Sequence, residues 1–158
     1  MKRAGLIIVG WILSVVAAAT VVYVRMKAIQ DELWRFAMKN DSILKVLDYW
    51  LELKGKGITV AENIKKHGYK NIAIYGYGVL GQRLYSELEG LDISITYIVD
   101  KNADQKVGDV PVISADSELP DTDVLIVTAI GDYRAIREKM LPRVKCPIVS
   151  LEDVIYGE

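Results

Sequence analysis

The N-terminal part of the chain is a long run of apolar residues that contains no charge. Ala4–Val24 spans 21 residues, and as a helix it would be roughly 31 Å long. That length matches the hydrocarbon core of a bilayer. A cleaved signal peptide is the alternative, since Ala17–Ala19 could serve as a cleavage site, but the run exceeds the usual apolar region of about 7–15 residues. We therefore predict a retained transmembrane anchor over residues 1–25.

A second hydrophobic pattern, over Met26–Trp50, has the spacing of a coiled coil. Steps of three and four residues alternate along Met26, Ile29, Leu33, Phe36, Asn40, Ile43, Leu47 and Trp50. A buried Asn40 in this seam would fix the register of a parallel dimer. An amphipathic helix that lies on the membrane or folds back on the next domain is the alternative, and Asn40–Ser42 could break the helix. We predict an amphipathic or coiled-coil helix and hinge over residues 26–57. If the coiled-coil alternative holds, the chain forms a homodimer through Met26–Trp50.

Residues 58–158 alternate short apolar runs with helical patterns. Thr59 and Glu62 have the S/T-x-x-E spacing of a helix capping box. The apolar runs predict five strands, at Asn71–Tyr75, Ile93–Val99, Val110–Ile113, Asp123–Thr128 and Pro147–Ser150. Helices are expected over Val79–Glu89 and Tyr133–Leu141. Because strands that alternate with helices form parallel sheets through right-handed crossovers, we predict an α/β fold with a small Rossmann-like parallel sheet in the order 3-2-1-4-5. Pro111 predicts that the third strand lies at an edge.

A glycine-rich turn follows the first of these strands. Gly76, Gly78 and Gly81 stand as G-x-G-x-x-G between a predicted strand and a predicted helix. In dinucleotide-binding folds, such glycines permit a tight turn, a close approach of a pyrophosphate to the backbone, and close packing of the helix on the sheet. The helix N-terminus then faces the phosphates. The sequence therefore predicts a binding segment that consists of Gly76, Tyr77, Gly78, Val79, Leu80 and Gly81.

Two further segments are expected at the same edge of the sheet. Asp100 ends the second strand about 20 residues after the glycines, where this fold places the carboxylate that binds a ribose. Lys101 follows it directly. The turn after the fourth strand supplies Ile130, Gly131 and Asp132. We expect Gly131 to permit close backbone approach, and Asp132 either to cap the next helix or to contact the ligand.

Composition narrows the chemistry. A net charge of −1 without a basic face argues against nucleic-acid binding. One Cys (Cys146) and one His (His67) exclude a disulfide framework and a zinc cluster, so no metal site is predicted. Tyr97 and Lys101 match the spacing of the Tyr/Lys pair of short-chain dehydrogenases, but they lie on a strand and not on the helix that carries that pair. Since no nucleophile stands beside a base, no catalytic residue is predicted.

Four segments carry a family resemblance: Gly76–Gly81, Tyr97–Asn102, Val110–Ile113 and Ala129–Arg134. Over about residues 58–158, the chain resembles the nucleotide-sugar-binding N-terminal domain of bacterial sugar acyltransferases. It is also similar to the Rossmann-like domain that follows the membrane helices in sugar dehydratases of polysaccharide biosynthesis. The resemblance implies that the ligand is a nucleoside-diphosphate sugar or NAD(P). The catalytic domains of those enzymes have no counterpart in this sequence.

Together these observations predict a membrane-anchored, non-catalytic nucleotide or nucleotide-sugar binding module. It would be a sensor or tether for enzymes of bacterial cell-surface polysaccharide biosynthesis. One alternative is an NAD(P)-dependent oxidoreductase or epimerase subunit whose substrate site is completed by a partner, and another is a domain without a ligand whose helix self-associates. Basic residues on the two sides of the apolar run nearly balance. The side of the membrane on which the domain lies is therefore predicted from its expected ligand. Because nucleotides and activated sugars are cytoplasmic, we expect the domain on the cytoplasmic face of the cell membrane.

Overall fold

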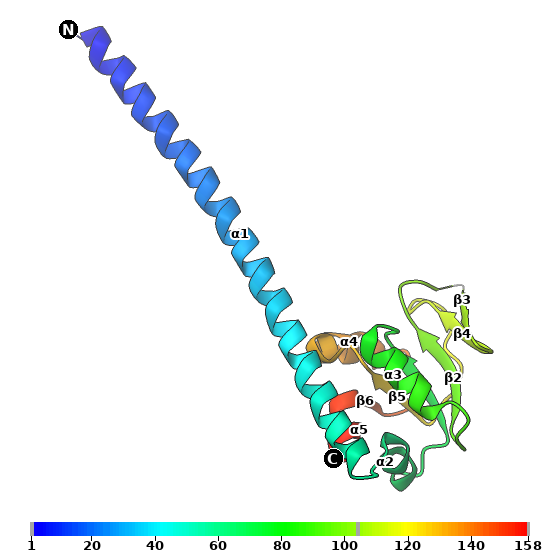
Figure 1. Cartoon of the computed structure of the whole chain (residues 1–158). Coiled ribbons are helices and arrows are strands. Elements are labelled where there is room, and N and C mark those ends of the chain that lie inside the picture. The colour runs from blue at the N-terminus through cyan, green and yellow to red at the C-terminus, as the bar shows by residue number, and fades with distance from the viewer. Residues whose placement is uncertain (1, 104, 158) are drawn as a thin grey trace. The chain divides into compact units, whose positions relative to one another are not determined.

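The structure, a computed structural model, describes residues 2–103 and 105–157. The elements follow one another as α1 (Lys2–Gly55), α2 (Val60–Lys66), β1 (Asn71–Tyr75), α3 (Val79–Leu88), β2 (Ser94–Val99), β3 (Gln105–Val107), β4 (Val110–Ile113), β5 (Val124–Val127), the 3₁₀ helix η1 (Ile130–Asp132), α4 (Tyr133–Met140), β6 (Ile148–Ser150) and α5 (Leu151–Tyr156) (Figure 1). The five predicted strands, and the helices predicted over Val79–Glu89 and Tyr133–Leu141, lie within one residue of their expected bounds. The elements β3, η1 and α5 were not predicted.

The apolar run and the predicted coiled-coil segment form one continuous helix, α1, without a break at Asn40–Ser42. The chain divides into two compact units, Met1–Asp41 and Ser42–Glu158. The second unit thus includes residues 42–57, which the sequence analysis assigned to the helix and hinge before the domain. Among the described residues, one helical segment, Leu13–Gly55 of α1, is long and apolar enough to cross a membrane.

The sheet has six strands and is mixed, where the sequence analysis predicted five parallel strands. Its order is β3-β4-β2-β1-β5-β6. The five predicted strands keep the predicted order 3-2-1-4-5, and the pairs among them are parallel. The additional strand, β3, pairs antiparallel with β4 beyond the turn at Gly108, whose φ is +59°.

The prediction that Pro111 marks an edge strand was therefore wrong. Pro111 pairs with Lys106 of β3, which takes the edge position instead. In an antiparallel pair, alternate residues make no hydrogen bonds to the partner strand. β4 can therefore pair with β3 although Pro111 has no N–H to donate. β3 itself is only three residues long and lacks a run of apolar residues, which explains why the pattern did not predict it.

Helices cover both faces of the sheet in the second unit, as the wholly buried β5 predicts. One face packs Ile72, Ile74 and Ile126 against α2, α3, α5 and the end of α1. The other face packs Ala73, Tyr97, Val99, Leu125 and Val127 against Met140 of α4. Successive strand residues point to opposite faces, so neighbours such as Ile72 and Ala73 belong to different cores.

The last part of α1 belongs to the core of the second unit. Val46, Trp50 and Leu53 are buried, and Ile43 and Leu47 pack against the same cluster. Ile43 and Trp50, which were predicted to lie in the dimer seam, therefore pack against the domain. For residues 43–53, the structure supports the alternative in which the helix packs on the domain.

A buried carboxylate joins α3 to the end of α1. Glu87, whose side chain is only 5% exposed, accepts a hydrogen bond from Nε1 of Trp50 at 2.8 Å and another from the backbone N–H of Val60 at 2.7 Å. Nζ of Lys54 lies 3.2 Å from the same carboxylate. Three donors thus compensate the loss of hydration of this buried charge.

Candidate nucleotide-binding site

The predicted site residues meet at the carboxyl ends of β1, β2 and β5. The backbone N–H of Tyr77 donates to Oδ2 of Asp100 at 2.8 Å, which joins the glycine turn to the end of β2. On the other side, Oγ1 of Thr128 donates to the carbonyl oxygen of Gly76 at 2.8 Å. The strand order changes direction here, between β1 and β5. Open α/β sheets bind their ligands at this switch point.

The structure gives two of the three motif glycines a reason to lack a side chain. Gly76 has φ = +96°, in the left-handed region that favours glycine, and a Cβ there would lie 3.0 Å from Oγ1 of Thr128. A Cβ on Gly81 would overlap the carbonyl oxygen of Gly76, so Gly81 lets α3 pack closely on the turn. Gly78 has an ordinary φ of −75° and no atom within 4 Å of its Cβ position. Nothing in the described part of the protein therefore requires a glycine at residue 78.

Helix α3 begins at this turn and presents backbone donors there. Its N-cap is Gly78, and its first intrahelical hydrogen bond runs from the N–H of Gln82 to the carbonyl of Gly78 at 2.9 Å. The N–H groups of Val79, Leu80 and Gly81 precede it and have no intrahelical acceptor. The side chain of Leu80 is buried in the core, whereas that of Val79 is 55% exposed. Leu80 can therefore contribute only its backbone to a ligand site.

Tyr77 supports the turn with both its backbone and its side chain. Its N–H is taken by Asp100, so this donor is occupied within the protein. Its ring packs edge to face on Tyr85, with ring centroids 6.1 Å apart. Burial, followed by the neighbouring Tyr85, raises the pKa of the Tyr77 phenol. Tyr77 is thus a neutral, half-buried wall of the turn.

Asp100 combines a structural role with spare acceptor capacity. Oδ2 accepts the Tyr77 N–H, and Oδ1 accepts the N–H of Asn102 at 3.0 Å. A carboxylate has about four lone-pair sites, so each oxygen can accept one more hydrogen bond, for example from a ribose hydroxyl. Lys101 beside it is exposed.

Thr128 belongs to the candidate site but was not predicted from the sequence. It is 5% exposed, and its hydroxyl lies 2.8 Å from the carbonyl oxygen of Gly76 and 3.1 Å from that of Tyr75. It thereby fixes the geometry with which the chain leaves β1. Its position in the sequence could have indicated this role, because Thr128 is a polar residue placed directly after the apolar run Val124–Val127.

The third predicted segment forms η1 just after Thr128. The side chain of Ile130 is buried in the core, whereas Gly131 and Asp132 are exposed. A Cβ on Gly131 would meet open space, so the turn itself does not require this glycine. Asp132 is the N-cap residue of α4, as one of the two predicted roles requires, but its side chain makes no capping hydrogen bond.

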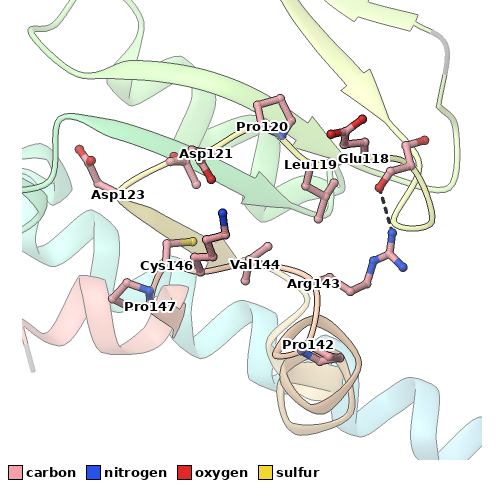
Figure 2. Close-up of a pocket in the computed structure, with 13 residues that line it drawn as sticks. Glu118, Leu119, Pro120, Asp121, Asp123, Pro142, Arg143, Val144, Cys146 and Pro147 are labelled. Carbon is pink, nitrogen blue, oxygen red and sulfur yellow. Dashed lines mark hydrogen bonds between the residues drawn. The ribbon is translucent and has the colours of Figure 1, made fainter.

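A pocket of about 1080 Å³ lies elsewhere, at the amino ends of β5 and β6. Figure 2 shows Leu119, Pro120 and Asp121 from the loop before β5 opposite Val144 and Cys146 from the loop before β6. The guanidinium of Arg143 donates to the carbonyl of Ser117 at 2.9 Å across the end of the pocket. Burial raises the pKa of the Cys146 thiol, which disfavours the reactive thiolate. This edge is opposite to the one where such sheets bind ligands, so we place the candidate site at the glycine turn.

Among the described residues, no group of three or more His, Cys, Asp or Glu side chains could hold a metal ion. No protein-family model, no curated protein and no solved structure matches this chain.

Proposed function

We propose that this chain is a membrane-anchored, non-catalytic module that binds a nucleotide or nucleotide-sugar. The observation that carries the proposal is the open space at Gly78. The turn needs Gly76 for its left-handed backbone and Gly81 for its packing, but Gly78 serves neither purpose. A glycine that the protein does not require, next to a helix N-terminus, is suited to the close approach of a pyrophosphate.

The neighbouring groups fit the two ends of such a ligand. The N–H groups at the start of α3 and the positive end of its dipole would bind the phosphates. The remaining lone pairs of Asp100 would accept hydrogen bonds from ribose hydroxyls, as they would in an unphosphorylated dinucleotide or a nucleoside diphosphate. Gly131 and Asp132, both exposed in η1 shortly after β5, would border the ligand on the β5 side.

The contacts of α3 support a role as a sensor or tether. Its first turn faces the proposed phosphates, and its last turn carries Glu87, which binds Trp50 and Lys54 of α1. A change in the position of α3 on ligand binding would therefore be transmitted to the end of the helix that carries the apolar run. Such a connection is what a membrane-linked sensor requires.

The cellular setting follows from the apolar run and from the resemblance to domains of surface-polysaccharide enzymes. A single span would anchor the module in the cell membrane. Nucleotides and activated sugars are cytoplasmic, so the binding domain would face the cytoplasm. Its partners would be enzymes of cell-surface polysaccharide biosynthesis, which would use the module to gather or report their activated-sugar substrate.

The test is calorimetric titration of the full chain in detergent with NAD, NADP, UDP and a UDP-sugar. We expect saturable binding of a UDP-sugar without turnover. Gly78→Val should weaken it at least tenfold, because the side chain would occupy the space of the pyrophosphate. Gly55→Val is the matched control, since Gly55 also has open space around its Cβ position but lies at the end of α1.

Each other outcome changes the proposal. Binding of NAD alone, together with hydride transfer once a partner is added, would replace it with the oxidoreductase alternative. Binding that Gly78→Val leaves unchanged would show that the site has been misplaced. If none of the four compounds binds, the nucleotide-binding proposal fails.

A further inference from the structure

The domain leaves a stripe of leucines uncovered on the part of α1 that it binds. Leu44 and Leu51 are 65% and 68% exposed, although Val46 and Trp50 beside them are buried. Leu47 lies between these two groups and is partly buried. Residues seven apart lie on the same side of a helix, with residue 47 next to both, so the three leucines form one continuous stripe.

In the sequence, this stripe follows the predicted seam with a displacement of one residue. The sequence pattern passed from Asn40 to Ile43 and Trp50, but those two side chains pack against the domain. Leu44 and Leu51 directly follow them. In the sequence, the steps Leu33–Phe36–Asn40–Leu44 are three, four and four residues. These 11 residues form the local repeat by which a coiled coil unwinds slightly and still keeps its seam.

The charges that flank the stripe indicate what can cover it. Asp41, Lys45 and Asp48 lie within about one turn of Leu44 on the helix. The segment therefore lacks the excess of Lys and Arg with which a helix binds the anionic lipids of a cytoplasmic membrane surface. A stripe of two leucines per heptad is also narrower than the wide apolar face of a helix that lies on a membrane. It has the width of a coiled-coil seam.

We propose that the stripe Leu44–Leu47–Leu51 is the dimer contact of this chain, and that its occupant is the same stripe of a second, parallel copy. Membrane anchoring holds two copies in the same orientation and raises their effective concentration. This inference rests on the proposed membrane anchoring and is independent of nucleotide binding.

The test is the mass of the full chain in detergent, measured by sedimentation equilibrium. We expect a dimer whose dissociation constant rises at least tenfold in Leu44→Lys/Leu51→Lys. Leu44→Ile/Leu51→Ile should retain the dimer, because it keeps the apolar seam. Leu141→Lys is the control, since Leu141 is also half exposed but lies at the end of α4.

The outcomes separate this inference from the proposed function. A wild-type monomer, or a dimer that the double lysine variant leaves unchanged, would overturn the seam. If Leu44→Lys/Leu51→Lys lowers the unfolding midpoint, Leu44→Ala/Leu51→Ala replaces it in the same measurement. Nucleotide titration of the same samples distinguishes the two proposals, because loss of the dimer with retained binding affects the seam alone.

Discussion

At the scale of single residues, the hydroxyl of Tyr97 is a buried polar group without a hydrogen bond among the described residues. The whole side chain is buried. Burial, with smaller contributions from Cys146 and Asp121, raises the pKa of Tyr97 to about 12. The hydroxyl therefore costs desolvation free energy without the compensation of a hydrogen bond.

We predict that Tyr97→Phe increases the free energy of unfolding by about 1 kcal/mol at neutral pH. The wild type should also lose stability between about pH 10 and about pH 12, because the unfolded chain releases the Tyr97 proton first. The Phe variant should lack this contribution to the alkaline loss. Urea unfolding at pH 7 and at pH 11 measures both effects.

Tyr85→Phe is the matched control. Its hydroxyl donates to the carbonyl of Val107 at 3.3 Å, so its removal should lower the free energy of unfolding by about 0.5–1 kcal/mol. A loss of stability in Tyr97→Phe as well would mean that the Tyr97 hydroxyl does have a partner.

At the scale of elements, Glu87 determines how three helices meet. It is the single acidic residue of α3, and its buried carboxylate binds the end of α1 and the first residue of α2. Its counterparts lie 37 and 27 residues away in the sequence. No local pattern distinguishes this glutamate from a solvated one, so the sequence could not predict its role.

We predict that Glu87→Ala lowers the free energy of unfolding by about 2–4 kcal/mol. The change would leave the N–H groups of Trp50 and Val60 without their acceptor. Glu87→Gln should lose less, because an amide oxygen still accepts one of these hydrogen bonds. Denaturant unfolding of the full chain provides the measurement. Glu89→Ala is the control at an exposed position nearby, and an equal loss there would contradict the role of Glu87.

At the scale of the whole molecule, the second unit extends to Ser42 and takes core side chains from α1. Three of these, Val46, Trp50 and Leu53, are buried. Burial of such side chains contributes about 1.5–3 kcal/mol each. Their sum is comparable to the roughly 5–15 kcal/mol that stabilises a typical domain.

We therefore predict that a chain of residues 42–158 folds, whereas one of residues 58–158 does not fold stably at 25 °C. The shorter chain would lack Val46, Trp50 and Leu53, which share one buried cluster with residues of α2, α3 and α5. Circular dichroism during urea unfolding compares the two. Equal unfolding midpoints would show that the domain begins at residue 58, as the sequence analysis predicted.

The sequence by itself determined most elements of the second unit, five of its six strands and the order of those five. It did so because apolar runs, capping residues and glycine turns act locally, and right-handed crossovers leave few topologies. The capping box at Thr59 and Glu62 is one such prediction that the structure confirms. The motif also brought Gly76 and Asp100 to one edge of the sheet, where the structure joins them through Tyr77.

Only the tertiary structure decided which face of the end of α1 the domain covers, which of the three motif glycines the fold does not require, and that β3 and not β4 forms the edge. Each of these depends on contacts between residues that are distant in the sequence. Ile43 and Trp50 pack against the domain, where Trp50 donates to Glu87, whereas Leu44 and Leu51, one residue further along the helix, remain exposed.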